Sequence, residues 1–222
     1  MSFPGRAMIA LALWPSGIHG QDAIALDLAE LARRGGLRAD ARDVSELLDG
    51  AYRGVRVSAG RSFEVIWIES LTFATGTIDL DVRGKDVQSQ SFLGIALGAT
   101  DDSTYESVFV RPFNFRASDP LRRMHSIQYE SMPAHPWSRL RSEFPEVFEN
   151  PADPPPDPND WVRLRVVVAL TSLEVFVGEG AEPDLVVDRI DEEPEGRVGL
   201  WVGNFSGGDF ANLRISRSSA RR

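Results

Sequence analysis

The chain contains no cysteine, and Lys85 is the only lysine among its 222 residues. The absence of cysteine excludes disulfides, thiolate zinc sites and a cysteine nucleophile. Arginine supplies nearly all of the positive charge, because it accounts for 23 of the 24 basic residues. This chain therefore uses arginine wherever a positive charge is needed, so an arginine does not by itself indicate a ligand-binding site.

Positive charge is also scarce overall, since the net charge is −9 and the sequence pI is about 4.9. This balance argues against a nucleic-acid partner held by phosphate neutralisation, and against an anionic membrane surface. Long apolar runs are absent as well. The run "AMIALALW", which follows Arg6, is too short to cross a bilayer.

The same run suggests export. A positive charge, a short apolar segment and small or turn-forming residues predict a signal peptide or N-terminal extension over residues 1–21. A buried first strand is the alternative. The first interpretation places the protein outside the cytoplasm, as a secreted or periplasmic protein.

Period-2 alternation and β-branched runs dominate from residue 63 onward and predict an all-β, two-sheet antiparallel sandwich. Turn signals separate the runs. The segment 22–48 suits either a strand or a helical turn. The predicted strands are 63–68, 76–83, 91–98, 105–115, 124–130, 161–170, 172–178, 184–189, 197–203 and 210–216.

One segment interrupts this pattern. Residues 132–160 contain eight prolines and almost no strand signal. The stretch "WSRLRSEF" predicts a short helix between Pro136 and Pro145. Because Trp137, Leu140 and Phe144 provide apolar contacts, we expect a long, ordered, proline-rich excursion over one sheet.

Several stretches together resemble the concanavalin A-like lectin/glucanase superfamily. They are "LTFATGTIDLDVRG", "SFLGIALG", "YESVFVRPFNFR", "HSIQYE" and "RVGLWVGNFSGGDFANLRI". The chain is most similar to the bacterial family-16-like glycoside hydrolase, or 3-keto-disaccharide hydrolase domain, branch. The resemblance covers roughly residues 22–218, leaving a tail at 219–222. It implies a jelly roll with a concave sheet that holds an oligo- or polysaccharide.

The glucanases of this superfamily carry an E-x-D-x-x-E strand that supplies two catalytic carboxyl groups, and the chain has no such strand. The resemblance instead implies a groove lined by two neighbouring strands, where Ser126 replaces the usual acid. Glu106 and Glu130 are the nearest replacements. The candidate catalytic residues are Glu106 and His125, and the candidate substrate-binding residues are Arg111, Asn114, Arg116, Gln128, Tyr129 and Trp137.

The face of each strand is not fixed by the sequence, because a one-residue shift of register would exchange the two sets of side chains. His125, Tyr129 and Arg116 also have a simpler interpretation, as surface residues or as buried residues whose hydrogen bonds go to other groups of the protein. We expect residues 105–116 and 124–130 to pair through "ASDPLRR", with Arg111 and Gln128 on one face.

Two further features have competing interpretations. Trp67 and Trp161 are predicted to be core residues, whereas Trp201 could pack in the core or stack on a sugar. The acidic loop residues Asp101, Asp102 and Asp209 could bind calcium. Aspartate is equally typical of tight turns, which explains these residues without a metal.

Three functions therefore remain open. The first is a glycoside hydrolase-like enzyme, or a lyase acting on uronate glycans. The second is a non-catalytic carbohydrate-binding module, and the third is a structural domain that binds no glycan.

Overall fold

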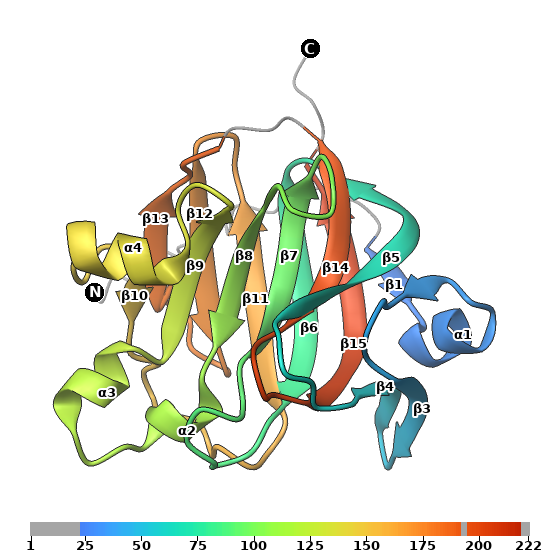
Figure 1. Ribbon diagram of the computed structural model, residues 1–222, viewed down its shortest axis with the longest axis horizontal. Coiled ribbons are helices and arrows are strands. Elements are labelled where there is room, and N and C mark those ends of the chain that lie inside the picture. Colours follow the sequence, from blue (N-terminus) through green and yellow to red (C-terminus); the bar gives the residue numbers. More distant parts are fainter. Residues whose placement is uncertain (1–22, 192–194, 219–222) are drawn as a thin grey trace, which may run out of the picture.

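The computed structural model describes residues 23–191 and 195–218. The expected leader at 1–21 and the tail at 219–222 therefore lie outside the described residues. Within them, two antiparallel sheets pack face to face, and short helices lie at the margins (Figure 1). No described helix is long and apolar enough to cross a membrane.

The first sheet, sheet A, has the order β13-β12-β11-β6-β15-β4-β3, and β1 pairs with the other part of β15. Its strands are β1 (Ile24–Leu26), β3 (Val44–Asp49), β4 (Tyr52–Val57), β6 (Gly76–Arg83), β11 (Val162–Val168), β12 (Ser172–Val177), β13 (Leu185–Asp188) and β15 (Gly208–Arg217).

The second sheet, sheet B, has the order β10-β9-β8-β7-β14-β5-β2. Its strands are β2 (Leu37–Arg38), β5 (Glu64–Phe73), β7 (Leu93–Ala99), β8 (Tyr105–Val110), β9 (Ile127–Met132), β10 (Glu149–Asn150) and β14 (Gly196–Val202). The helices are α1 (Leu28–Arg33), α2 (Pro112–Phe115), α3 (Pro120–Met124) and α4 (Trp137–Glu143).

Sheet A has one buried face and one wet face, as its alternating sequence predicts. In β11, Leu164 and Val166 are buried against sheet B, while Arg163 and Arg165 point to solvent. Arg165 Nε lies 2.7 Å from a carboxylate oxygen of Asp79 on β6. The outer face of sheet A is therefore a ladder of cross-strand ion pairs.

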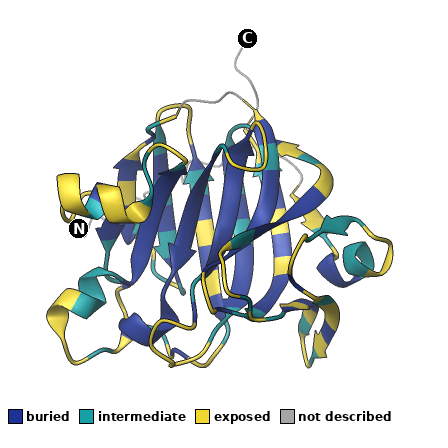
Figure 2. Ribbon diagram, viewed as in Figure 1, coloured by how far each residue is buried: buried dark blue, intermediate teal, exposed yellow. Residues whose placement is uncertain are grey.

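The central strands of sheet B are buried on both faces. Every residue of β7 and β8 is buried, and Figure 2 shows these central strands in dark blue along their length. Val108 and Val110 point into the core between the sheets, whereas Tyr105 and Phe109 belong to a separate apolar cluster on the outer face. Something other than sheet A must therefore cover that outer face.

Each of the ten predicted strands is found, but β3 and β4 were not predicted, and several strand ends differ from the prediction. The predicted strand 105–115 ends at Val110, because Pro112 begins α2, where its missing N–H costs no hydrogen bond. The predicted strand 124–130 begins only at Ile127, after α3. The ambiguous segment 22–48 contains both a strand, β1, and a helix, α1.

The prediction that Trp161 is a core residue was wrong. Its ring is only partly buried and stacks on Tyr52 at a centroid distance of 4.3 Å. The guanidinium of Arg83 lies 4.7 Å from the same ring.

The proline-rich excursion is ordered, as expected, and it extends sheet B. Residues 137–143 form α4, whose Leu140 is fully buried. Glu149 and Asn150 then form β10, which pairs with β9 at the sheet edge. In Figure 1, α4 lies beside β9 and β10. The excursion therefore places a helix next to the outer face of sheet B.

Candidate functional site

The outer face of sheet B carries an aromatic cluster. Trp201 on β14 stacks on Phe109 on β8, with ring centroids 4.2 Å apart. Gly94 of β7 lies between them in the register, and a Cβ there would come within 2.7 Å of the Phe109 Cβ. A glycine at this position therefore lets the two rings meet across the intervening strand. The cluster consists of Val65, Trp67, Ala96, Ala99, Tyr105, Phe109 and Trp201.

A pocket of about 140 Å³ opens at one end of this cluster; we call it the sheet pocket. Phe63 and Trp137 stand at its margin, with 46% and 38% of their surface exposed. Aromatic walls around a few polar groups are the usual composition of a small-molecule site. The lining residues are Phe63, Phe92, Phe109, Glu130, Met132, Pro136, Trp137, Trp201, Gly203 and Asn204.

Glu130 supplies a buried carboxyl group to this pocket. One of its oxygens accepts a hydrogen bond from the Ser107 hydroxyl at 2.9 Å, and the other accepts one from the Trp137 backbone N–H at 3.1 Å. Burial raises the pKa of Glu130, although these two hydrogen bonds and the charge of Arg111 partly oppose the effect. Glu130 therefore also fixes the first residue of α4 against the sheet.

Among the described residues that line the sheet pocket, Glu130 is the only acid. A retaining glycosidase uses two carboxyl groups about 5–5.5 Å apart, and an inverting enzyme also uses two. The pocket can therefore hold a ligand, but its lining does not supply an acid pair.

Four of the predicted site residues do come together, at the end of the β8–β9 pair. The guanidinium of Arg111 donates to the His125 carbonyl at 2.8 Å and to the Gln128 side-chain oxygen at 3.3 Å. The Asn114 amide donates to the same His125 carbonyl at 3.1 Å. Arg111 directly follows β8 and contacts Gln128 on β9, and the predicted antiparallel pairing of these two strands is confirmed.

The side chains of this group are buried and contact other residues of the same chain. Arg111, which is 3% exposed, lies within 5.6 Å of the ring centroids of Phe92, Phe109 and Trp137. Burial lowers the pKa of Arg111 to about 9, so its guanidinium stays charged at neutral pH. Gln128 is fully buried and donates to the carbonyls of Tyr129 and Phe148. The group supports the pocket wall from beneath and does not line the pocket.

His125 is held at the edge of the same group. Its Nδ1 lies 2.8 Å from a carboxylate oxygen of Glu149, which also accepts hydrogen bonds from Arg141. Burial lowers the pKa of His125, and the charge of Arg141 acts in the same direction. His125 is absent from the lining of the sheet pocket, so its predicted catalytic role gains no support from this position.

The prediction that Glu106 and Tyr129 line the groove is wrong. Both point between the two sheets, on the face opposite to Phe109, because they are one residue out of phase with the outer set. The Tyr129 hydroxyl donates to Glu106 at 2.5 Å, and Arg189 forms an ion pair with the same carboxylate. Arg116 is also misplaced, since its guanidinium lies at the surface, 3.0 Å from Asp157.

The three acidic residues considered for calcium do not form a site. Asp101 accepts hydrogen bonds from the backbone and hydroxyl groups of Ser103 and Thr104, mainly from Ser103, which lowers its pKa to about 2. Asp102 and Asp209 are each paired with two arginines. Within residues 23–191 and 195–218, no cluster of three or more acidic or histidine side chains could hold a metal ion.

Sequence reasoning missed several aromatic residues of the pocket, including Phe63, Phe92 and Phe109. The alternation along β8 could have predicted this outer face. Tyr105 and Phe109 occupy one set of alternate positions, and Val108 and Val110 occupy the other. Two such phases, both apolar, indicate a strand that is covered on both faces.

Neither a known protein family nor a curated protein matches the chain in sequence. In structure the chain is similar to the carbohydrate-binding module CBM66 from Bacillus subtilis, with a TM-score of 0.57 and 14% identity, over 82% of this chain and 96% of that one. A protein of unknown function with a galectin-like fold from Bacillus subtilis gives a TM-score of 0.57 and 12% identity, over 87% and 94% of the two chains.

The exoplasmic/lumenal domain of VIP36, in its Ca²⁺/Man-bound form, gives a TM-score of 0.51 and 13% identity, over 90% of this chain and 91% of that one. At such low identity these likenesses establish the fold alone. The shared fold is a jelly roll of two antiparallel sheets.

Proposed function

We propose that the chain is a non-catalytic carbohydrate-binding module that holds a sugar unit in the sheet pocket. The observation that carries the proposal is the pocket itself, whose lining combines the aromatic residues Phe63, Trp137 and Trp201 with the polar residues Glu130 and Asn204. Aromatic rings offer apolar faces to a sugar ring, while carboxylate and amide groups bond its hydroxyls.

The size of the pocket limits the size of the ligand that it can hold. A volume of about 140 Å³ is well below the roughly 300 Å³ at which drug-sized sites begin. The pocket therefore suits a single ring or the end of a chain. The structural likeness to a carbohydrate-binding module and to a Man-bound lumenal domain supports this proposal.

Export belongs to the same proposal. Extracellular polysaccharide is the natural ligand of such a module, and the N-terminal segment 1–21 has the features of a secretory signal. We therefore propose that the protein is secreted or periplasmic.

The test is a binding measurement with soluble cello-, xylo-, manno-, arabino- and fructo-oligosaccharides, using calorimetry on the full chain. We expect at least one series to bind, and Phe63→Ala to weaken that binding by about tenfold, because truncating an aromatic anchor removes its contact with the ligand. Phe144→Ala is the matched control. Phe144 has nearly the same exposure, 48% against 46%, but lies outside the pocket. Absence of binding to every series would refute the proposal.

A second candidate function is that of the family-16-like glycoside hydrolase branch, with Glu130 as a general acid. The raised pKa of this buried carboxyl favours it, since a general acid must hold its proton near neutral pH. Release of reducing ends from any of these oligosaccharides, abolished by Glu130→Gln, would support hydrolysis. Binding without release by the wild type would reject it.

A further inference from the structure

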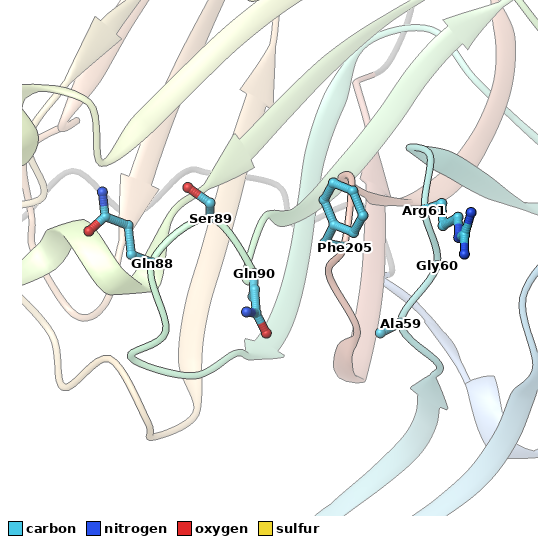
Figure 3. A pocket seen from close by; sticks show the side chains of 7 residues that line it. All are labelled: Ala59, Gly60, Arg61, Gln88, Ser89, Gln90 and Phe205. Atoms are coloured by element: carbon cyan, nitrogen blue, oxygen red, sulfur yellow. The ribbon is translucent and has the colours of Figure 1, made fainter.

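A second groove, of about 490 Å³, lies at the end of the sandwich (Figure 3); we call it the end groove. Three connections form it: the β4–β5 connection, the β6–β7 connection and the β14–β15 connection. The lining residues are Ala59, Gly60, Arg61, Gln88, Ser89, Gln90 and Phe205.

Phe205 occupies the middle of this groove in an unusual backbone conformation. Its φ is 56°, in the left-handed region that bulky residues avoid, and 59% of its surface is exposed. In Figure 3 its ring stands between Gln88 and Ser89 on one side and Gly60 and Arg61 on the other. A strained residue whose ring faces solvent gains nothing from core packing, so its conformation points to a function.

The neighbouring backbone fixes this conformation. The Phe205 N–H donates to the Gly60 carbonyl at 2.7 Å. The buried guanidinium of Arg42 donates to the carbonyls of Gly203 and Ser206 on either side of the ring, and to those of Ser58 and Ser62 in the opposite loop. The backbone that carries the Phe205 ring is therefore held in place by hydrogen bonds.

The polar groups of the end groove suit a sugar as well. Its lining has two glutamine amides and a serine hydroxyl, which can both donate and accept hydrogen bonds. Among the described lining residues there is no carboxylate, although the molecule as a whole is strongly acidic.

The same three connections also border the sheet pocket. Arg61, Gln90 and Phe205 line the end groove, while Phe63, Phe92 and Asn204, one or two residues away in the sequence, line the sheet pocket. The two sites are therefore built from the same three connections, and their lining residues are close neighbours in the sequence.

We propose that the end groove binds the next units of a saccharide whose end lies in the sheet pocket, with one ring stacked on Phe205. This inference rests on the proposed function, and it adds that the ligand is an oligosaccharide bound over more than one unit. Affinity should therefore rise with chain length.

The experiment is calorimetry on the full chain, with each oligosaccharide series extended from monomer to hexamer. For the series that binds, we expect the wild type to gain about tenfold or more in affinity between monomer and longer chains. Phe205→Gly should remove this gain and leave monomer affinity unchanged. Because glycine accepts a positive φ, the variant should fold with a melting temperature close to that of the wild type.

Glu146→Gly is the matched control. Glu146 is an exposed residue with φ of 65° and lies in neither site, so this variant should keep the full gain with length. If monomer and hexamer bind the wild type equally, or if Phe205→Gly keeps the gain, the end groove is not a subsite and the proposed function stands. If no series binds the wild type at all, both proposals fail.

Discussion

Arg42 is a single side chain on which the shape of both pockets depends. Its guanidinium is almost fully buried, and its four hydrogen bonds all go to backbone carbonyls. Two of these carbonyls belong to the loop before β5, and two belong to the loop after β14. A planar, five-donor group is the side chain that can join two loops in this way.

Arg42→Lys should therefore destabilise the protein while keeping the charge. Lysine has three donors on one atom and cannot reach carbonyls on both sides, so buried carbonyls lose their partners, at about 1–3 kcal/mol each. We expect the free energy of unfolding to fall by about 2–4 kcal/mol in urea titrations. The exposed Arg34 provides a control, since Arg34→Lys should change stability by less than about 0.5 kcal/mol.

At the scale of residues, the sequence predicted which residues lie close together more accurately than it predicted which of them line the pocket. Arg111 and Gln128 lie together as predicted, because the pairing of β8 with β9 places Gln128 opposite Phe109, two residues before Arg111. Glu106 and Tyr129 were misplaced, because a strand that is buried on both faces shows no polar side by which its phase can be read. Their burial is satisfied by a partner, Arg189, that comes from a distant strand connection.

At the scale of elements, α4 is the part of the excursion that shapes the sheet pocket. Trp137 and the preceding Pro136 line the pocket, and the helix is anchored by the fully buried Leu140. The prolines predicted the interruption, and the flanking Pro136 and Pro145 predicted the helix. That residues 149–150 would return as an edge strand could not be predicted, because a two-residue pairing leaves no periodic pattern.

Leu140→Ala tests this anchoring. Removing a fully buried leucine side chain should lower the free energy of unfolding by about 2–4 kcal/mol, through lost burial and a residual cavity. It should also increase amide exchange in residues 137–143, measured by hydrogen–deuterium exchange, because the helix loses its buried contact. Unchanged exchange there would show that the ion pair of Arg141 with Glu149 suffices to hold α4.

At the scale of the whole molecule, a buried ion pair joins the two sheets. Arg189 follows β13 of sheet A, and its guanidinium meets Glu106 on β8 of sheet B, where both side chains are nearly inaccessible. Burial raises the pKa of Glu106, and Arg189 opposes that shift. Because the folded pKa lies above the unfolded one, this carboxyl stabilises the fold below the unfolded pKa, and that stabilisation is lost as the pH rises through the folded pKa.

Arg189→Met should enlarge this pH dependence. Without its cation, Glu106 is a lone buried charge at neutral pH, so we expect a loss of about 3–5 kcal/mol at about pH 7. The loss should be smaller near about pH 3, where the carboxyl is protonated in the folded state and largely protonated in the unfolded state. Urea unfolding at the two pH values measures the difference. In the double variant Glu106→Gln/Arg189→Met the difference should disappear, and a difference that persists would assign the pH effect to another group.

The edges of sheet B bear on the kind of partner that the molecule can bind. Both of its edge strands, β2 and β10, are two residues long, so each has few backbone N–H and C=O groups of its own for an added chain. A peptide that recognises its receptor by strand addition needs a longer free edge. The edge strands themselves therefore offer only a short template for strand addition, whereas the face of sheet B offers aromatic and polar side chains.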